Sequence, residues 1–414
     1  MGKSIIVYNH CDKYLSLLIA SLAFGGVGGA YQIVRILSIL LLPFVINRFP
    51  MVKGYLRPFL AALSLFYIYC LLSLIWTPDK AEAVKELIYY PIHFLLFVEI
   101  LIFARFAKEP LRSISYGWVM AVFLTSFVAI WEFTTDHHLN ISRYGYDGVR
   151  MANLGTEIMQ RHFAAATFTN LNSYVTFLCF AFPFLSYGFM QAKKKSFESI
   201  FFILNIFLSI IFILFNASRG GLLTICLMGL TYLLSSKKNQ RTIMLLTIIL
   251  IGGAFVLLFL NDMLTLIHVR VNSSHQLTGE DRFTIWQHAW EAFMPTCGLG
   301  VGVGGMIKAM ETVTRGITST HNIGIEILLQ YGVLFFSAFI YYLFYLFKSS
   351  IKIKEKSIRT ALFMALFAMP FYLIIDSGYL LKPVVFAAFA SIQVFTNFER
   401  SLFLHRFFIR YIKS

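Results

Sequence analysis

Long apolar runs separated by short polar stretches constrain the fold of this chain more than any other feature. A run of about 18 apolar residues is long enough to cross a bilayer as a helix. Backbone within lipid has to satisfy its own hydrogen bonds, which a helix does. Hydrophobic residues make up 58% of the chain and charged residues 13%, against about 45–50% and about 25% in soluble domains. The sequence therefore predicts an all-α polytopic membrane protein.

The pattern predicts about twelve transmembrane helices. The expected spans are residues 14–30, 33–47, 58–76, 87–104, 114–134, 171–190, 199–216, 220–235, 242–260, 322–347, 360–377 and 382–398. No A-x-A cleavage signal follows the first run, so we expect it to be retained. The five cysteines form no CxxC pair and indicate neither a disulfide framework nor a metal site.

The loops between these runs alternate in charge. One set is short and basic, as at Lys193-Lys194-Lys195, and the other contains acidic residues such as Asp136 and Glu280. The positive-inside rule places the basic set, and with it both termini, in the cytoplasm. The net charge of +15 is thus explained by topology, and we expect no nucleic-acid partner.

The division of the chain follows from this topology. Residues 1–260 hold nine spans and an outer loop at 135–170, residues 322–398 hold three spans, and residues 399–414 form a basic cytoplasmic tail. The outer loop 261–321 lies between the ninth and the tenth span, and loops of this length are usually functional. Apolar residues at helical spacing predict an amphipathic helix at 280–293, lying in the outer interface and ended by Pro295.

The tightest outer hairpin carries Ser218-Arg219-Gly220. An arginine at this depth can simply reach the lipid headgroups. The glycine, however, permits close approach by a ligand or another helix, and the planar guanidinium suits phosphate oxygens. We therefore keep Arg219 and Ser218 as candidate site residues.

The long outer loop contributes further candidates. Arg270, Arg282 and Trp286 precede a glycine cluster at 298–305. That cluster lacks the Lys-Ser/Thr ending of a phosphate loop, so we reject a nucleotide site. Arg282 could instead pair with the neighbouring acids Glu280 and Asp281. At the end of the loop, His321-Asn322 opens a span, where a cap is the ordinary explanation and a general base the functional one.

A last group precedes the sixth span. The asparagines Asn170 and Asn172 could cap the helix, or they and Arg161 could face a polar ligand such as a sugar. Together these motifs place positive charge, a histidine and amide groups on one outer face. No carboxylate pair with glycosidase spacing accompanies them.

At these residues the chain resembles the O-antigen polymerase and O-antigen ligase superfamily of bacterial envelope proteins. The shared motifs are Ser218-Arg219-Gly220, Arg282 with Trp286, the P-x-x-G-x-G turn at 295–300, and His321-Asn322. Two positions depart from the family pattern. Leu171 replaces the proline of F-x-N-P-N, and Gln330 replaces a glutamate that often follows H-N; Glu326, one turn earlier, is a possible substitute.

The resemblance implies a GT-C-like glycosyltransferase of the bacterial inner membrane, with its active site on the periplasmic face. Its substrate would be an undecaprenyl-diphosphate-linked glycan. The acceptor would be a second lipid-linked repeat unit for a polymerase or lipid A-core for a ligase, with a chain-length regulator as a further candidate partner. No metal or other cofactor is expected.

Within that framework Arg219 and Arg282, helped by Arg270, would hold the diphosphate while His321 takes the proton of the acceptor hydroxyl. The other candidates, which would position substrate, are Arg161, Asn170, Asn172, Ser218, Asn322 and Trp286. A flippase or transporter is the alternative class, for which the intramembrane acid Glu99 would be the functional candidate. We expect the polymerase.

Overall fold

The computed structural model describes residues 2–145, 163–235, 282–313 and 319–413, and every regular element among them is helical. The α-helices are α1 (Gly2–Ala20), α2 (Ile33–Ser73), α3 (Lys80–Phe106), α4 (Pro110–Thr135), α6 (Leu171–Gln191), α7 (Phe197–Phe215), α8 (Arg219–Ser235), α10 (Arg282–Phe293), α11 (Met306–Glu311), α12 (Ile323–Ile351), α13 (Lys356–Tyr372) and α14 (Pro383–Lys413). Short 3-10 turns are η1 (Ser21–Phe24), η2 (Gly29–Tyr31), η4 (Met294–Thr296) and η5 (Tyr379–Leu381).

Six of the described helices are long and apolar enough to cross a membrane, namely α2, α3, α4, α6, α7 and α12. Two shorter apolar helices, α8 and the first half of α14, pack among them. The prediction of an all-helical polytopic membrane protein is therefore confirmed. The expected span at 242–260 lies outside the described residues.

Two expected spans differ from the structure at the N-terminal end. The span at 14–30 is wrong in its second half, because α1 ends at Ala20 and 3-10 turns follow. Gly25 and Gly28 there adopt positive φ values of 46° and 88°, which is incompatible with a continuing right-handed helix. The apolar composition of the segment concealed this break.

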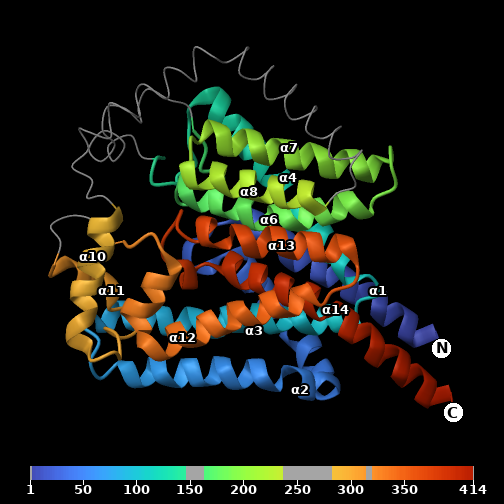
Figure 1. The fold of residues 1–414 in the computed structure, drawn as a ribbon, viewed down its shortest axis with the longest axis horizontal. Helices are drawn as coiled ribbons and strands as arrows, with labels where there is room; N and C mark the ends of the chain where they lie inside the picture. The colour runs from blue at the N-terminus through green and yellow to red at the C-terminus, as the bar shows by residue number, and fades with distance from the viewer. Residues whose placement is uncertain (1, 146–162, 236–281, 314–318, 414) are drawn as a thin grey trace.

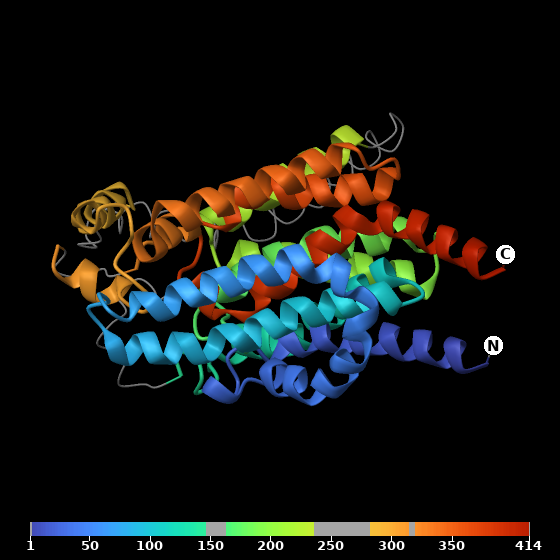
Figure 2. The ribbon, with the colours of Figure 1, turned by 90° about the horizontal axis from the view of Figure 1, so that it is seen from below.

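The expected spans at 33–47 and 58–76 belong to one helix, so the loop predicted between them is wrong. Helix α2 runs for 41 residues through Pro43, Pro50 and Pro58. Each proline removes a backbone donor and bends a helix. Figure 2 shows α2 bending so that its two halves run in opposite directions.

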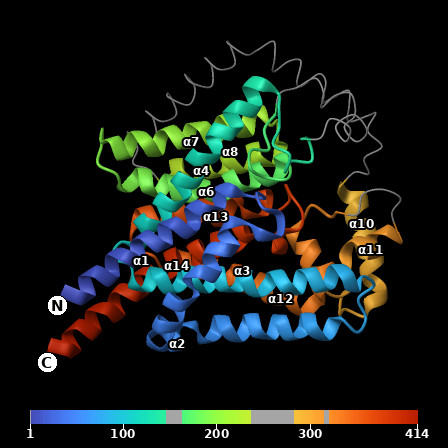
Figure 3. The same ribbon diagram turned by 180° about the vertical axis from the view of Figure 1, so that it is seen from behind.

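The helices form an elongated bundle with distinct ends. Figures 1 and 3 show both termini close together at one end and α10 and α11 at the other. Helix α6 is the most buried of the candidate spans. It packs against α4, α7, α8 and α13, and α13 in turn lies along α8. Helix α6 therefore lies at the centre of the bundle.

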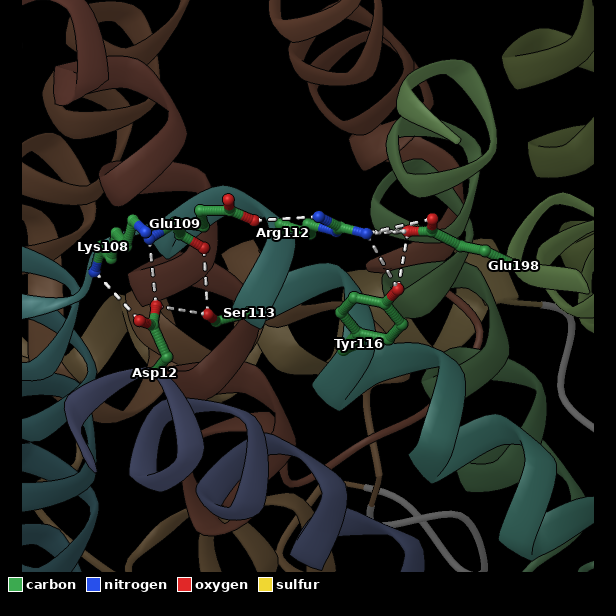
Figure 4. Close-up of polar contacts among 7 residues, drawn as sticks. All are labelled: Asp12, Lys108, Glu109, Arg112, Ser113, Tyr116 and Glu198. Atoms are coloured by element: carbon green, nitrogen blue, oxygen red, sulfur yellow. Dashed lines mark hydrogen bonds and ion pairs between the residues drawn. The ribbon is translucent and has the colours of Figure 1, made fainter. Parts of the chain in front are cut away.

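Polar side chains join three helices near the termini (Figure 4). Asp12 of α1 accepts hydrogen bonds from the backbone N–H groups of Lys108 and Glu109, each at 3.1 Å, and so satisfies donors at the start of α4. Arg112 of α4 forms an ion pair of 3.0 Å with Glu198 of α7. These contacts fix α1 and α7 against α4.

The glycine cluster 298–305 at the opposite end serves packing. Val301 and Gly302 donate backbone hydrogen bonds to the carbonyls of Leu329 and Gln330, and Val333 donates to Gly298. These contacts lie at a kink of α12 where Gly332 has a φ of 78°. A Cβ at Gly332 would lie 2.3 Å from the Gly298 oxygen, so two glycine backbones meet where side chains would clash.

Candidate functional site

The short segment between α13 and η5 joins two of the predicted motifs. The Arg282 Nη1 atom donates a hydrogen bond of 2.7 Å to the carbonyl of Ile374. One residue later, Ile375 packs on Gly220, where a Cβ would lie 2.9 Å from Ile375 Cγ1. The segment thus brings α10 and the start of α8 together, although they are far apart in sequence.

Arg219 is the first residue of α8 and therefore lies beside this junction. Its side chain is exposed and makes no hydrogen bond or ion pair with the residues that the structure describes. Ser218, by contrast, has a structural role, because its Oγ accepts a hydrogen bond of 3.3 Å from the Gly221 N–H. The arginine is free to meet a ligand, whereas the serine caps the helix.

Several charged groups influence the pKa of His321. Burial lowers its pKa below the ordinary value, while the Asp376 carboxylate raises it and Arg282, Lys382 and Arg143 lower it. Its Nδ1 atom is buried and has no hydrogen-bond partner among the described residues. A half-buried imidazole that is neutral near pH 7 is a competent proton acceptor.

The backbone around His321 is held from three directions. Trp286 of α10 donates from Nε1 to the Thr320 carbonyl at 2.9 Å, and the Ile323 N–H donates to the Leu373 carbonyl at 3.1 Å. The Asn322 side chain accepts from Gly324 and caps α12. His321 itself has a φ of 48°, an uncommon value outside glycine. Trp286 and Asn322 therefore position the histidine.

An ion pair between Asp376 and Lys382 lies beside this histidine. Asp376 is buried, and the Lys382 ammonium also donates to Ser173 Oγ at 3.1 Å. Glu326 of α12 fixes the intervening turn, because its carboxylate accepts from the N–H groups of Gly378 and Tyr379 at 2.9 and 3.1 Å. Glu326 thus supports the site through the backbone.

Gln330, one of the two positions that depart from the predicted family pattern, faces a different network. It donates to the buried carboxylate of Glu86 on α3, which also accepts from Tyr90 at 2.6 Å and from the Gly304 N–H at 3.1 Å. The carboxylate beside Gln330 is therefore that of Glu86, which comes from α3. It anchors the glycine cluster to α3 and α12.

Of the two asparagines before the sixth span, one has a structural role in capping the helix. Asn170 caps α6 by accepting from the Ser173 N–H at 2.8 Å, and Asn172 is half-buried. Arg161 and Arg270 lie outside the described residues. The structure therefore gathers Arg282, His321 and the start of α8, and leaves the roles of the other candidates as predictions.

Two basic residues at this site were not predicted from the sequence. Lys382 and Arg143 act on His321, as does Asp376. A signal existed for the two basic residues, since both lie in or beside outer segments where the positive-inside rule expects few such residues. The pairing of Lys382 with Asp376 could have been suspected from their six-residue separation across a turn.

The fold is that of a polytopic helical membrane protein, and the site is built where α10, the start of α12 and the segment after α13 meet. Residues 204–340 match a family model described as O-antigen ligase. This range contains Arg219, Arg282 and His321. The relative described below agrees with this match, and together they support a protein of the O-antigen ligase or polymerase type.

A relative from Bacillus subtilis (strain 168) supports the same assignment. The chain is 25% identical over 316 residues to the teichuronic acid biosynthesis protein TuaE. The alignment covers 72% of this chain and 61% of TuaE, less than two thirds of that relative's length. No solved structure matches the chain. The predicted family resemblance is confirmed.

Proposed function

We propose that this protein is a membrane glycosyltransferase that polymerises undecaprenyl-diphosphate-linked oligosaccharide repeat units. It transfers the growing glycan to a sugar hydroxyl of an acceptor unit. One observation carries the proposal: the segment around Ile374 and Asp376 brings Arg282 and the start of α8 to the environment of His321. Cationic groups for a diphosphate and a base for a hydroxyl therefore share one site.

The reaction is a direct displacement at the anomeric carbon. The acceptor oxygen forms the new glycosidic bond as the bond from that carbon to the diphosphate oxygen breaks, which inverts the carbon. His321 takes the hydroxyl proton, and the diphosphate leaves with the bonding electrons. Arg219 and Arg282 stabilise the charge that develops on the leaving group, without a metal ion. Such charge-assisted contacts are strong and are often the largest catalytic contribution.

Bundle geometry supports a periplasmic location for this chemistry. The two termini lie at the opposite end of the bundle from α10 (Figure 1), and the positive-inside rule places the termini in the cytoplasm. In the proposed topology about twelve spans cross the inner membrane, α2 supplies two of them through its bend, and His321 faces the periplasm.

Purified protein with a lipid-linked repeat unit tests this proposal. We expect wild type to form a glycan ladder and His321→Ala and Arg219→Ala to form none while retaining their elution profile in detergent. The matched controls are the exposed residues His137 and Arg57, whose alanine variants should form normal ladders. Normal ladders from both site variants would refute the mechanism.

An O-antigen ligase is the second candidate function, favoured by the family description. The acceptor would then be lipid A-core, and the same arginines and histidine would act. A deletion strain separates the two functions. Loss of a polymerase should leave single repeat units on the acceptor, whereas loss of a ligase should accumulate lipid-linked polymer. We favour the polymerase.

A lipid-linked glycan flippase is a third candidate, favoured by Glu99 in α3. This carboxylate is fully buried, and neither oxygen has a hydrogen-bond partner in the described part of the chain. Intramembrane acids of this kind commonly mark transport pathways. Ion-coupled flux in vesicles that Glu99→Gln abolishes, without any glycan extension by the purified protein, would favour transport over transfer.

A further inference from the structure

A cavity of about 260 Å³ adjoins the Asp376–Lys382 ion pair. The first turns of α2 and α6, the η1 region and the segment from Asp376 to Val384 surround it. Polar side chains in its wall include Gln32, Thr169, Ser173 and Thr176, and apolar ones include Leu22 and Val34. Its size is slightly below the range of about 300–1,000 Å³ for small-molecule sites, which suits one compact ring.

Two polar atoms in this wall have no hydrogen-bond partner in the part of the chain that the structure describes. Thr176 is 1% exposed, yet its Oγ1 makes no hydrogen bond within the described residues, and the same holds for Gln32 Oε1. Three other buried threonines within helices, Thr125, Thr224 and Thr396, donate to carbonyls of their own helices, in Thr396 to the Ile392 carbonyl at 2.8 Å. A buried polar group without a partner is destabilising, so the wall is suited to a ligand with hydroxyl groups.

The cavity and the catalytic base share two residues. Asp376 and Lys382 line the cavity and also act on His321 through their charges. The other end of the same segment meets Arg282 at Ile374 and α8 at Ile375. Charged groups at both ends of this segment therefore act on His321. Arg282, proposed to hold the diphosphate, contacts one end, and the cavity adjoins the other.

We propose that this cavity is the subsite for the terminal sugar of the acceptor, a proposal that rests on the proposed glycosyl transfer. A sugar ring presents several hydroxyl groups, each both donor and acceptor. Asp376 and Gln32 Oε1 offer acceptors, Lys382 and Thr176 offer donors, and the apolar wall contacts the C–H faces of the ring. Binding here presents an acceptor hydroxyl to His321.

The test uses Thr176→Val, which removes the unpartnered hydroxyl at nearly constant volume. We expect the KM for the acceptor to rise about 3- to 10-fold, the effect of one lost hydrogen bond, with little change in kcat. Gln32→Leu should act in the same direction. The control is Thr396→Val on α14, a buried threonine outside the cavity wall, which should keep the wild-type KM.

A binding measurement separates this proposal from the proposed reaction. The probe is a soluble repeat-unit fragment from the host's own envelope polysaccharide, without lipid or phosphate. It should raise the melting temperature of wild type, His321→Ala and Thr396→Val, but not that of Thr176→Val or Gln32→Leu. Equal stabilisation of all five proteins would overturn the subsite even if transfer is confirmed. Subsite binding by a protein that forms no glycan bond would overturn only the reaction.

Discussion

Arg282 and Ile374 are joined by a hydrogen bond of 2.7 Å from the guanidinium to the backbone carbonyl across 92 positions of sequence. The side chain is otherwise exposed. This contact orients one guanidinium nitrogen toward the turn beside His321 and leaves the remaining donors available. This arginine therefore fixes a loop while the rest of its guanidinium stays exposed.

Replacing this arginine by lysine should separate geometry from charge. Arg282→Lys keeps the charge but cannot present two parallel donors. We expect kcat for glycan transfer to fall by about 10²–10³, the usual effect of losing one transition-state donor. Steady-state kinetics with a lipid-linked substrate measures this, and Arg57→Lys on exposed α2 surface is the control. A kcat within a factor of two of wild type would contradict the assigned role.

The acid limb of the pH–rate profile should reflect protonation of the His321 imidazole. Burial lowers the pKa of His321 below its ordinary value, so activity should persist below pH 6.5 and fall only when the imidazole is protonated. The Asp376 carboxylate raises this pKa. Asp376→Asn should therefore lower it further and move the acid limb to lower pH.

Rates between pH 4.5 and 8 test this direction, with Glu311→Gln as control because that carboxylate is not among the groups acting on His321. An acid limb that moves to higher pH in Asp376→Asn would show that another group titrates.

Glu326 should contribute to stability through two backbone groups. Its carboxylate accepts from the N–H groups of Gly378 and Tyr379. In Glu326→Gln the amide NH₂ faces one of these donors, which leaves a buried N–H unsatisfied at a cost of about 1–3 kcal/mol. Thermal unfolding in detergent should show a lower melting temperature than wild type, while the exposed Glu311→Gln should not. An unchanged melting temperature would mean that the turn has another support.

Gly332 should tolerate no side chain. Its φ is 78°, and a Cβ would lie 2.3 Å from the Gly298 oxygen. Strain of this kind costs about 1–3 kcal/mol, and the clash adds to it, so Gly332→Ala should unfold at a markedly lower temperature. Gly229 of α8 has open space around it, and Gly229→Ala should be neutral or stabilising because alanine is the better helix former. Equal stability of the two variants would contradict the described packing.

Helix existence was largely predictable from the sequence. The expected spans at 171–190 and 199–216 agree with α6 and α7, and the amphipathic segment at 280–293 agrees with α10. These elements follow from the length of each apolar run and from local capping by Asn170 and Ser196. The bend of α2 was not predictable, because prolines within an apolar run can either end a helix or bend it.

The sequence by itself determined that this chain is a helical membrane protein and that Arg219, Arg282 and His321 belong to a shared set of motifs. Composition, run length and short motifs carry that information locally. Only the tertiary structure decided which groups meet at the site. Lys382 pairs with Asp376, Glu326 holds the turn between them, and Arg282 contacts Ile374. These contacts depend on how α8, α10, α12 and α13 pack, which apolar periodicity does not encode because lipid-facing and helix-facing residues are equally apolar.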